Sequence, residues 1–379
     1  MYRLAAFLFA PLVLTLVVHG RLAAQTVERI RLANPTAEFP EPFSSIAGMR
    51  ELSDGRVVVS DRLEKAVRIL DFGSGSLREV GRVGSGPGEY QMPGTLLPLA
   101  ADSTLLVDFG NLRVIVIGPD GRIHGSTSMQ HETGRFINPQ GSDAEGRIYF
   151  DDLGSYSGPP DVLPDSAAIL RWDLVADRFD TVGFMPRPEV RMMSAGGGGG
   201  RYGVGRMNPL EARDAWSVAP DGSLAIARSD PFHVEWRMPD GRAARGPEVT
   251  YEPVPVTDED KEEFANRSTM GGMYTSGGEG GGSRYIRLPS PDAYEMVWPE
   301  VKPPFTRDGV RVTPEGEMWV RRYVTHGAPQ VHDVFDGAGR RIKQVELPAG
   351  RRLVGFGDGV LYLVRVDEDD LQWVEQYPR

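Results

Sequence analysis

The chain has 379 residues, no cysteine and a formal net charge of −11. Without cysteine it has neither disulfides nor a cysteine-linked lipid anchor, so core packing alone has to hold the fold. The acidic balance argues against nucleic acid and an anionic membrane surface as partners.

The first 24 residues predict a secretory signal. Arg3 precedes an apolar stretch from Leu4 to Val18, and Leu22-Ala-Ala24 supplies small residues for cleavage. A membrane-spanning helix needs about 20 apolar residues, more than this stretch offers. We expect residues 1–24 to be removed and residues 25–379 to form one domain, exported to the periplasm or the exterior without membrane insertion.

One short phrase, an acidic turn followed by an apolar run, occurs six times along the rest of the chain. Three of the five intervals between copies are 43 or 48 residues, the length of a four-stranded propeller blade. The two longer intervals contain insertions at 187–213 and 251–305. Acidic-Gly turns of this kind join antiparallel strands. The sequence therefore predicts an all-β fold, a six-bladed β-propeller of four-stranded antiparallel blades. The acidic residues of the six turns are Asp54, Asp102, Glu145, Asp221, Glu315 and Asp358.

The sixth blade is one strand short, because after its turn the chain offers only Gln372 to Tyr377. The segment Val27 to Leu32 is a spare strand. We expect it to become the outer strand beside 372–377 and to close the ring, which removes open sheet edges. A β-sandwich or an open solenoid is the alternative.

The first two blades resemble NHL-repeat propellers. The resemblance rests on Asp54 to Asp61 followed by Val67 to Asp71, on the glycine-rich link Gly81 to Tyr90, and on Leu106 to Asp108. It implies a six-bladed propeller of the bacterial, exported kind. That family includes ligand-binding modules, protein-interaction modules and a few enzymes, so the fold does not decide between them.

The long segments all fall on one face of the predicted ring. With the strands of a blade labelled A to D from the axis outward, the B–C loops and D–A links share a face, here called the loop face. Both insertions are D–A links. Residues 152–166 and 323–329 are B–C loops that carry Tyr156 and His326. We expect function at the loop face, because loops carry function more often than the scaffold does.

Within the second insertion, Thr257 is expected to cap a charged helix that runs to Phe264. The glycine-rich stretches 195–205 and 271–284 have few apolar side chains to offset the entropy of ordering, so we expect them to have little order.

The predicted B strands end in acids in blades 1 to 3 and in arginines in blades 4 to 6. This arrangement would polarise the loop face and orient a zwitterion or an extended peptide. The alternative is structural: the acids accept backbone hydrogen bonds and the arginines pair with neighbouring strands. The candidate ligand-binding residues are Asp61, Asp108, Asp151, Asp152, Arg228, Arg321, Arg322 and Arg365, with Tyr156 and His326.

Catalytic motifs are weak. The sequence has no helix-borne zinc pair, no Gly-x-Ser-x-Gly elbow and no cysteine nucleophile. We predict a monomeric, non-catalytic protein without a cofactor, which binds an unidentified protein, peptide or small molecule at the loop face. The alternative is a calcium-dependent propeller hydrolase or lactonase. The resemblance to such enzymes would place a calcium ion on the axis, near Asp61, Asp108 and Asp152.

Overall fold

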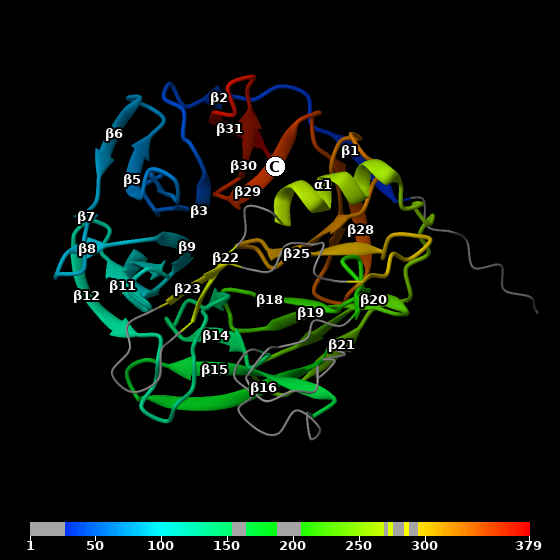
Figure 1. Ribbon diagram of the computed structural model, residues 1–379, viewed down its shortest axis with the longest axis horizontal. Helices are drawn as coiled ribbons and strands as arrows, with labels where there is room; N and C mark the ends of the chain where they lie inside the picture. Colours follow the sequence, from blue (N-terminus) through cyan, green and yellow to red (C-terminus); the bar gives the residue numbers. More distant parts are fainter. Residues whose placement is uncertain (1–26, 154–163, 188–205, 269–271, 276–283, 288–294) are drawn as a thin grey trace, which may run out of the picture.

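In the computed structural model the described residues form a ring of six blades, each with four antiparallel strands, and one blade carries an additional fifth strand (Figure 1). The structure describes residues 27–153, 164–187, 206–268, 272–275, 284–287 and 295–379. The predicted signal, residues 1–24, therefore lies outside the described residues. Among those described, no helix is long and apolar enough to span a membrane.

The first three blades follow the chain in order. Their strands are β3 (Ile46–Glu51), β4 (Val57–Asp61), β5 (Ala66–Asp71) and β6 (Ser76–Glu79) in blade 1; β9 (Pro93–Pro98), β10 (Thr104–Asp108), β11 (Arg113–Ile117) and β12 (Ile123–Ser128) in blade 2; and β13 (Gly141–Ser142), β14 (Ile148–Asp151), β15 (Ser166–Asp173) and β16 (Arg178–Pro186) in blade 3. A short 3₁₀ turn, Ala100–Asp102, lies in blade 2, and β7 (Arg82–Val83) pairs with β8 (Glu89–Tyr90) in the link between blades 1 and 2.

The other three blades complete the ring. Their strands are β18 (Ala215–Val218), β19 (Leu224–Ser229), β20 (Phe232–Arg237) and β21 (Ala243–Arg245) in blade 4; β25 (Phe305–Val312), β26 (Met318–Arg322), β27 (Val331–Phe335) and β28 (Arg341–Glu346) in blade 5; and β29 (Arg351–Phe356), β30 (Val360–Val366) and β31 (Gln372–Pro378) in blade 6, joined by β2 (Ala37–Glu38). The first strand of each blade is the innermost, and these strands surround the axis (Figure 1).

The repeated phrase forms the tight turn between the first two strands of every blade. In five blades its glycine takes a φ between +66° and +88°, a conformation that costs glycine little. In blade 2 no glycine is available, and Ala101 and Asp102 adopt φ values of 53° and 55° instead.

The core consists of apolar layers between neighbouring blades. Apolar residues of one sheet pack against those of the next: Leu70 and Val364 share the layer between blades 1 and 6, and Phe232 and Phe335 share the layer between blades 4 and 5. The runs of β4 and β10 are buried throughout, because both faces of these strands are covered.

The ring is closed by the N-terminal segment, but not through the strand that the sequence predicted. The segment β1 (Glu28–Arg31) runs parallel to β28 as a fifth strand of blade 5. The strand that completes blade 6 is β2, antiparallel to β31. The apolar side chains of Ile30 and Leu32 explain the difference, because they pack on the layer between blades 5 and 6. Both open edges are thus covered by one short segment.

The described parts of the two insertions contain short paired strands and one helix. The strand β17 (Arg206–Met207) of the first insertion runs parallel to β24 (Glu295–Met296) of the second. In the second insertion β22 (Gly272–Thr275) pairs with β23 (Arg284–Arg287). The rest of the stretch 271–284 lies outside the described residues, so its expected low order stays a prediction. The stretch 195–205 lies outside the described residues. The predicted helix is present as α1 (Asp258–Ser268), drawn in front of the ring in Figure 1.

Candidate functional site

The loop face has the organisation that the loop lengths predicted. Both insertions join the outer strand of one blade to the inner strand of the next, and the segments 152–165 and 323–330 join second to third strands. The predicted acids and arginines stand at the loop-face ends of β4, β10, β14, β19, β26 and β30. Tyr156 lies outside the described residues.

The predicted acids of blades 1 and 2 accept hydrogen bonds from backbone N–H groups. Asp61 is buried and accepts a hydrogen bond from the Ser44 N–H at 2.7 Å. Asp108 is also buried; it accepts hydrogen bonds from the Met92 N–H at 2.9 Å and the Asn111 side-chain amide at 2.7 Å. These carboxylates fix the links between blades, as the structural alternative expected.

The acids of blade 3 make similar local bonds. Asp151 accepts from the Leu153 N–H at 3.3 Å. Asp152 accepts from the Ala168 N–H at 2.8 Å and faces the Arg187 guanidinium at 3.4 Å. Asp151 is half-buried and lines a small cavity.

Two of the predicted arginines pair with carboxylates of their own or a neighbouring strand. Arg228 lies 2.9 Å from both Asp214 and Glu235. Burial by itself would lower the pKa of Arg228, but the hydrogen bonds to these two carboxylates outweigh it and raise the pKa. Arg365 lies 2.9 Å from Glu38. The polarity across the loop face is therefore largely neutralised within each blade.

The two arginines of blade 5 differ from each other. Arg322 pairs with the buried Asp333 at 3.0 Å and stacks on the Tyr251 ring, with 5.1 Å between the guanidinium carbon and the ring centroid. Arg321 points to the inner strand, where it pairs with Asp308 at 2.7 Å. Adjacent side chains of one strand point to opposite faces of the sheet, which explains the division.

A wide bulge interrupts the pairing of β25 with β26. The strand pairs with β26 at Phe305 and again at Val310, and residues 306–309 between these points lie outside the regular register. A Cβ at Gly309 would collide with Thr306 Oγ1 and Arg321 Cβ, so only glycine fits there. The bulge exposes Arg307 and Asp308 on the innermost strand. A glycine inside a strand is the sequence signal for a bulge, and the predicted elements did not make use of it.

Arg307 helps to line a cavity of about 60 Å³ together with residues of blades 3 and 4. The other lining side chains are Gln140, Asp151, Leu153, Met185, Pro186, Arg213, Asp214, Ala215 and Trp216. The cavity thus places Arg307 of blade 5 near Asp151, one of the predicted acids of blade 3.

The axis does not fit calcium in the part of the chain that the structure describes. Calcium takes six to eight oxygen ligands. The acids on the described inner strands are Glu51 and Asp308. Glu51 accepts hydrogen bonds from the Tyr362 hydroxyl and the Asp358 N–H, and Asp308 is paired with Arg321. The candidates Asp61, Asp108 and Asp152 accept hydrogen bonds from backbone N–H groups, so these carboxylates are already engaged.

A second group of functional side chains lies where α1 meets a B–C loop. Thr257 caps the helix: its hydroxyl oxygen accepts a hydrogen bond from the Asp260 N–H at 3.4 Å, and its own N–H donates to the Asp260 carboxylate at 2.9 Å. The buried Lys302 ammonium donates to Asp260 Oδ1 at 2.7 Å and to the Val324 carbonyl at 2.9 Å. Lys302 therefore ties α1 to the loop that carries His326.

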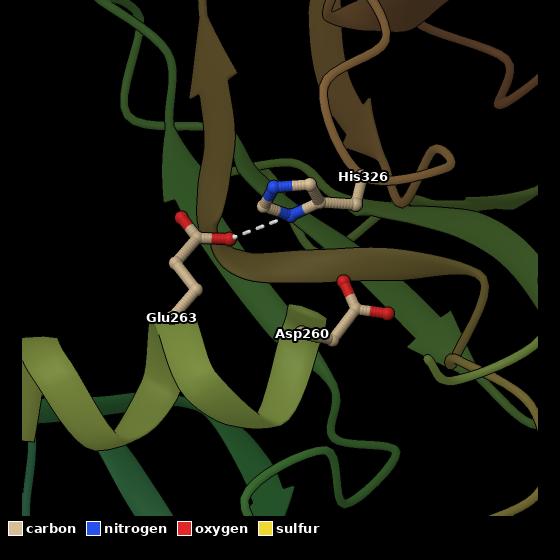
Figure 2. A group of neighbouring side chains, drawn as sticks. All are labelled: Asp260, Glu263 and His326. Carbon is tan, nitrogen blue, oxygen red and sulfur yellow. Dashed lines mark ion pairs between the residues drawn. The ribbon is translucent and has the colours of Figure 1, made fainter. Parts of the chain in front are cut away.

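His326 faces the side of α1. Its Nδ1 lies 3.4 Å from a carboxylate oxygen of Glu263, and the Asp260 carboxylate is next to the same ring (Figure 2). The histidine side chain is 44% exposed and Glu263 43% exposed, so both are open to a ligand. The helix packs on the insertion through Phe264, whose ring meets Trp298 edge-on at 5.6 Å.

The ligand atoms of Asp260, Glu263 and His326 lie within 4.8 Å of one another, a candidate arrangement for a divalent cation. Calcium would need more oxygens than these. A transition metal accepts imidazole with carboxylates. However, Asp260 already accepts from Lys302 and Thr257, and a metal would adjoin the Lys302 ammonium. The cluster fits acid–base chemistry better than metal binding.

A larger groove of about 740 Å³ lies at the outer edge of blade 5. It separates β1 from the loop around Tyr251 and includes Arg29, Arg322 and Arg341. Arg322 and Arg341 both face Asp333, which neutralises part of its charge.

No family model matches the chain, and no curated protein matches it in sequence. Solved structures do match. A calcium-binding regucalcin from Agrobacterium tumefaciens is 12% identical, with 93% of this chain and 96% of that chain covered and a TM-score of 0.43. A gluconolactonase from Xanthomonas campestris is 12% identical, with 92% and 94% covered and a TM-score of 0.45. A streptogramin B lyase is 12% identical, with 90% and 86% covered and a TM-score of 0.40.

These comparisons correct the predicted function. The structures found include a lactonase and a lyase, which contradicts the prediction of a non-catalytic binding protein; the alternative, a propeller hydrolase, fits better. The six-bladed propeller is confirmed, and the NHL resemblance stays a prediction. Identities this low show the fold alone, so an activity has to be argued from this chain's own residues.

Proposed function

We propose that this protein is an enzyme that hydrolyses lactone or ester bonds at its loop face, with His326 as the acid–base group. The observation that carries the proposal is the Glu263–His326 pair, a carboxylate 3.4 Å from an imidazole nitrogen on a half-exposed surface. A carboxylate beside one ring nitrogen orients the imidazole and stabilises its protonated form.

The surrounding residues hold the pair in position. Lys302 bonds both the helix that carries Glu263 and the loop that carries His326. Burial by itself would raise the pKa of Asp260, but the hydrogen bonds from Lys302 and Thr257 outweigh it and lower the pKa. Asp260 therefore stays ionised as the anchor, and its role is to position the pair.

The chemistry requires only water as co-reactant. His326 accepts a proton from water while the water oxygen bonds to the carbonyl carbon of the substrate. The bond from that carbon to the ring or ester oxygen then breaks, and His326 returns the proton to the departing oxygen. The products are a carboxylic acid and an alcohol, which for a lactone stay in one molecule.

Export is also part of the proposal, supported by the pattern of residues 1–24. Mass spectrometry of the protein secreted by a bacterial host should find Gln25 at the N-terminus. An intact Met1 would contradict export by this signal.

The activity test uses the mature chain with a panel of lactones and p-nitrophenyl esters. His326→Gln should lower kcat about 10²-fold or more. Glu263→Gln should lower kcat less and shift the pH–rate profile. Glu262→Gln is the matched control, because the neighbouring Glu262 is exposed on the same helix; it should leave the activity unchanged.

The same hydrolysis assay is repeated with added calcium and with the chelator EDTA. Because the described residues do not fit calcium, EDTA should leave hydrolysis unchanged. Hydrolysis that survives in His326→Gln, or that disappears with EDTA and returns with calcium, would refute this assignment.

A further inference from the structure

The groove at the outer edge of blade 5 has a floor of polar side chains that the pairing of three strands brings together. Asp333 of β27 lies opposite Gln344 of β28, and Gln344 lies opposite Arg29 of β1. The side chain of Ile30 packs on the layer between blades 5 and 6, so the neighbouring Arg29 points to the other face of the sheet. There Arg29 and Gln344 line the groove of about 740 Å³.

The buried Asp333 carboxylate fixes the inner part of this floor. It lies 3.0 Å from the Arg322 guanidinium and 3.4 Å from that of Arg341, and it accepts a hydrogen bond from the Gln344 amide at 2.7 Å. Arg341 and Gln344 meet at the same oxygen, Oδ1, so their side chains are held next to each other. One carboxylate thus orders two guanidinium groups but neutralises a single positive charge.

Arg29 adds a positive charge that is not paired. It is exposed, and its side chain has neither a hydrogen bond nor an ion pair in the part of the chain that the structure describes. By contrast, Arg31 of the same strand pairs with Glu346 at 3.3 Å. The other acid among the lining residues is Glu252, on the loop that forms the opposite wall. The floor therefore has an excess of positive charge, although the whole chain has a formal net charge of −11.

The rest of the lining offers apolar and aromatic surface, which includes Tyr251, Val324 and Val331. The Tyr251 ring is held in place edge-on to the buried Phe232, with 6.3 Å between the ring centroids, and it carries the Arg322 guanidinium on its face. Sites for small organic molecules commonly have volumes of about 300–1,000 Å³, with apolar walls and a few fixed polar groups. The groove has this form.

We propose that the groove binds a small organic monocarboxylate, with the carboxylate between Arg29 and Arg341 and the apolar or aromatic body against Tyr251 and Val324. A guanidinium presents paired N–H donors that match the two oxygens of a carboxylate. The apolar walls favour such a ligand over a bare oxyanion such as phosphate. Glu252 repels negative charge, so it limits the ligand to one acidic group.

This site does not depend on the proposed hydrolysis. The groove includes Tyr323 and Val324 of the loop that carries His326, but neither His326 nor Glu263 lines it. Binding of a carboxylate that has no bond to hydrolyse is therefore measured separately from activity.

The test is isothermal titration calorimetry on the mature chain, in chloride buffers of equal ionic strength. The probes are benzoate, benzyl alcohol, which has the ring without the charge, and inorganic phosphate, which has charge without the ring. Benzoate should bind about tenfold more tightly than either. Arg29→Gln should weaken benzoate binding about tenfold, because it removes hydrogen bonds to a charged group. Arg122→Gln is the matched control, since Arg122 is 83% exposed on the outer part of blade 2, and it should bind as the parent does.

A second variant should gain affinity, which a damaged fold would not produce. Glu252→Gln removes the negative charge from the wall, so it should tighten benzoate binding about twofold to fivefold, the usual effect of an exposed charge. The proposal is overturned if benzoate does not bind the parent, if phosphate or benzyl alcohol binds as tightly as benzoate, if Arg29→Gln binds as Arg122→Gln does, or if Glu252→Gln leaves the affinity unchanged.

Discussion

Ring closure depends on Phe39, and this can be tested by one substitution. Phe39 follows β2, its ring is fully buried, and its N–H donates to the Val374 carbonyl of blade 6 at 2.9 Å. The ring meets Phe72 of blade 1 edge-on at 5.4 Å. Phe39 therefore holds the first blade to the last.

Phe39→Ala removes a whole buried ring at the joint between two sheets. The expected loss of unfolding free energy is about 3–5 kcal/mol. Ile30→Ala is the comparison: Ile30 of β1 is half-buried, so its truncation should cost about 1 kcal/mol. The difference arises because β1 adds a fifth strand to blade 5, whereas β2 supplies a strand that blade 6 lacks.

The assay is equilibrium unfolding in guanidinium chloride, followed by far-UV circular dichroism and tryptophan fluorescence. Coincident transitions from both probes are needed before free energies are compared. If Ile30→Ala costs as much as Phe39→Ala, the ring is closed through β1, and our assignment of the closing strand is wrong.

Three further predictions concern stability. Burial lowers the pKa of His332 in the folded protein to about 3, against a usual value of 6.5, so between these pH values the unfolded chain binds a proton that the folded protein does not. The free energy of unfolding should therefore fall as the pH drops below 6.5, by up to about 1.4 kcal/mol per pH unit. Unfolding curves at pH 7, 6 and 5 should show a weaker pH dependence for His332→Gln. An unchanged slope would contradict a neutral, buried His332. Asp108→Asn should lower the free energy of unfolding by about 2–3 kcal/mol in chemical denaturation, because a buried carboxylate that accepts backbone and side-chain hydrogen bonds becomes an amide. Stability equal to that of the parent would show that these hydrogen bonds are replaceable. Gly246→Ala should lower the melting temperature by several degrees, because its Cβ would collide with the Gly339 backbone of the next blade; an equal melting temperature would show that the blades can separate at no cost.

Local patterns predicted most of the architecture. The six turns, the interval between them and the alternating runs are short-range features, and they are enough to identify six blades and the face of the long loops. The cap at Thr257 is also local, since the helix that follows it begins within one residue. The acids at the strand ends were placed correctly in sequence; their role was left open between ligand binding and support of the backbone, and the structure shows that they hold backbone N–H groups.

The rest depended on contacts between distant segments, which no local pattern encodes. Whether β1 or β2 completes the last blade depends on where their apolar side chains are buried. Ile30 of β1 packs against the apolar layer between blades 5 and 6, so β1 pairs with blade 5. Glu263 and His326 are 63 positions apart in the chain, and Lys302 joins their elements only after the insertion has folded back.

The separate roles of the two arginines of blade 5 were hidden for the same reason. The sequence by itself determined that Arg321 and Arg322 end the same strand. The tertiary structure decided that Arg321 pairs with Asp308 and Arg322 with Asp333, because the bulge in β25 and the pairing of β26 with β27 bring these carboxylates within reach.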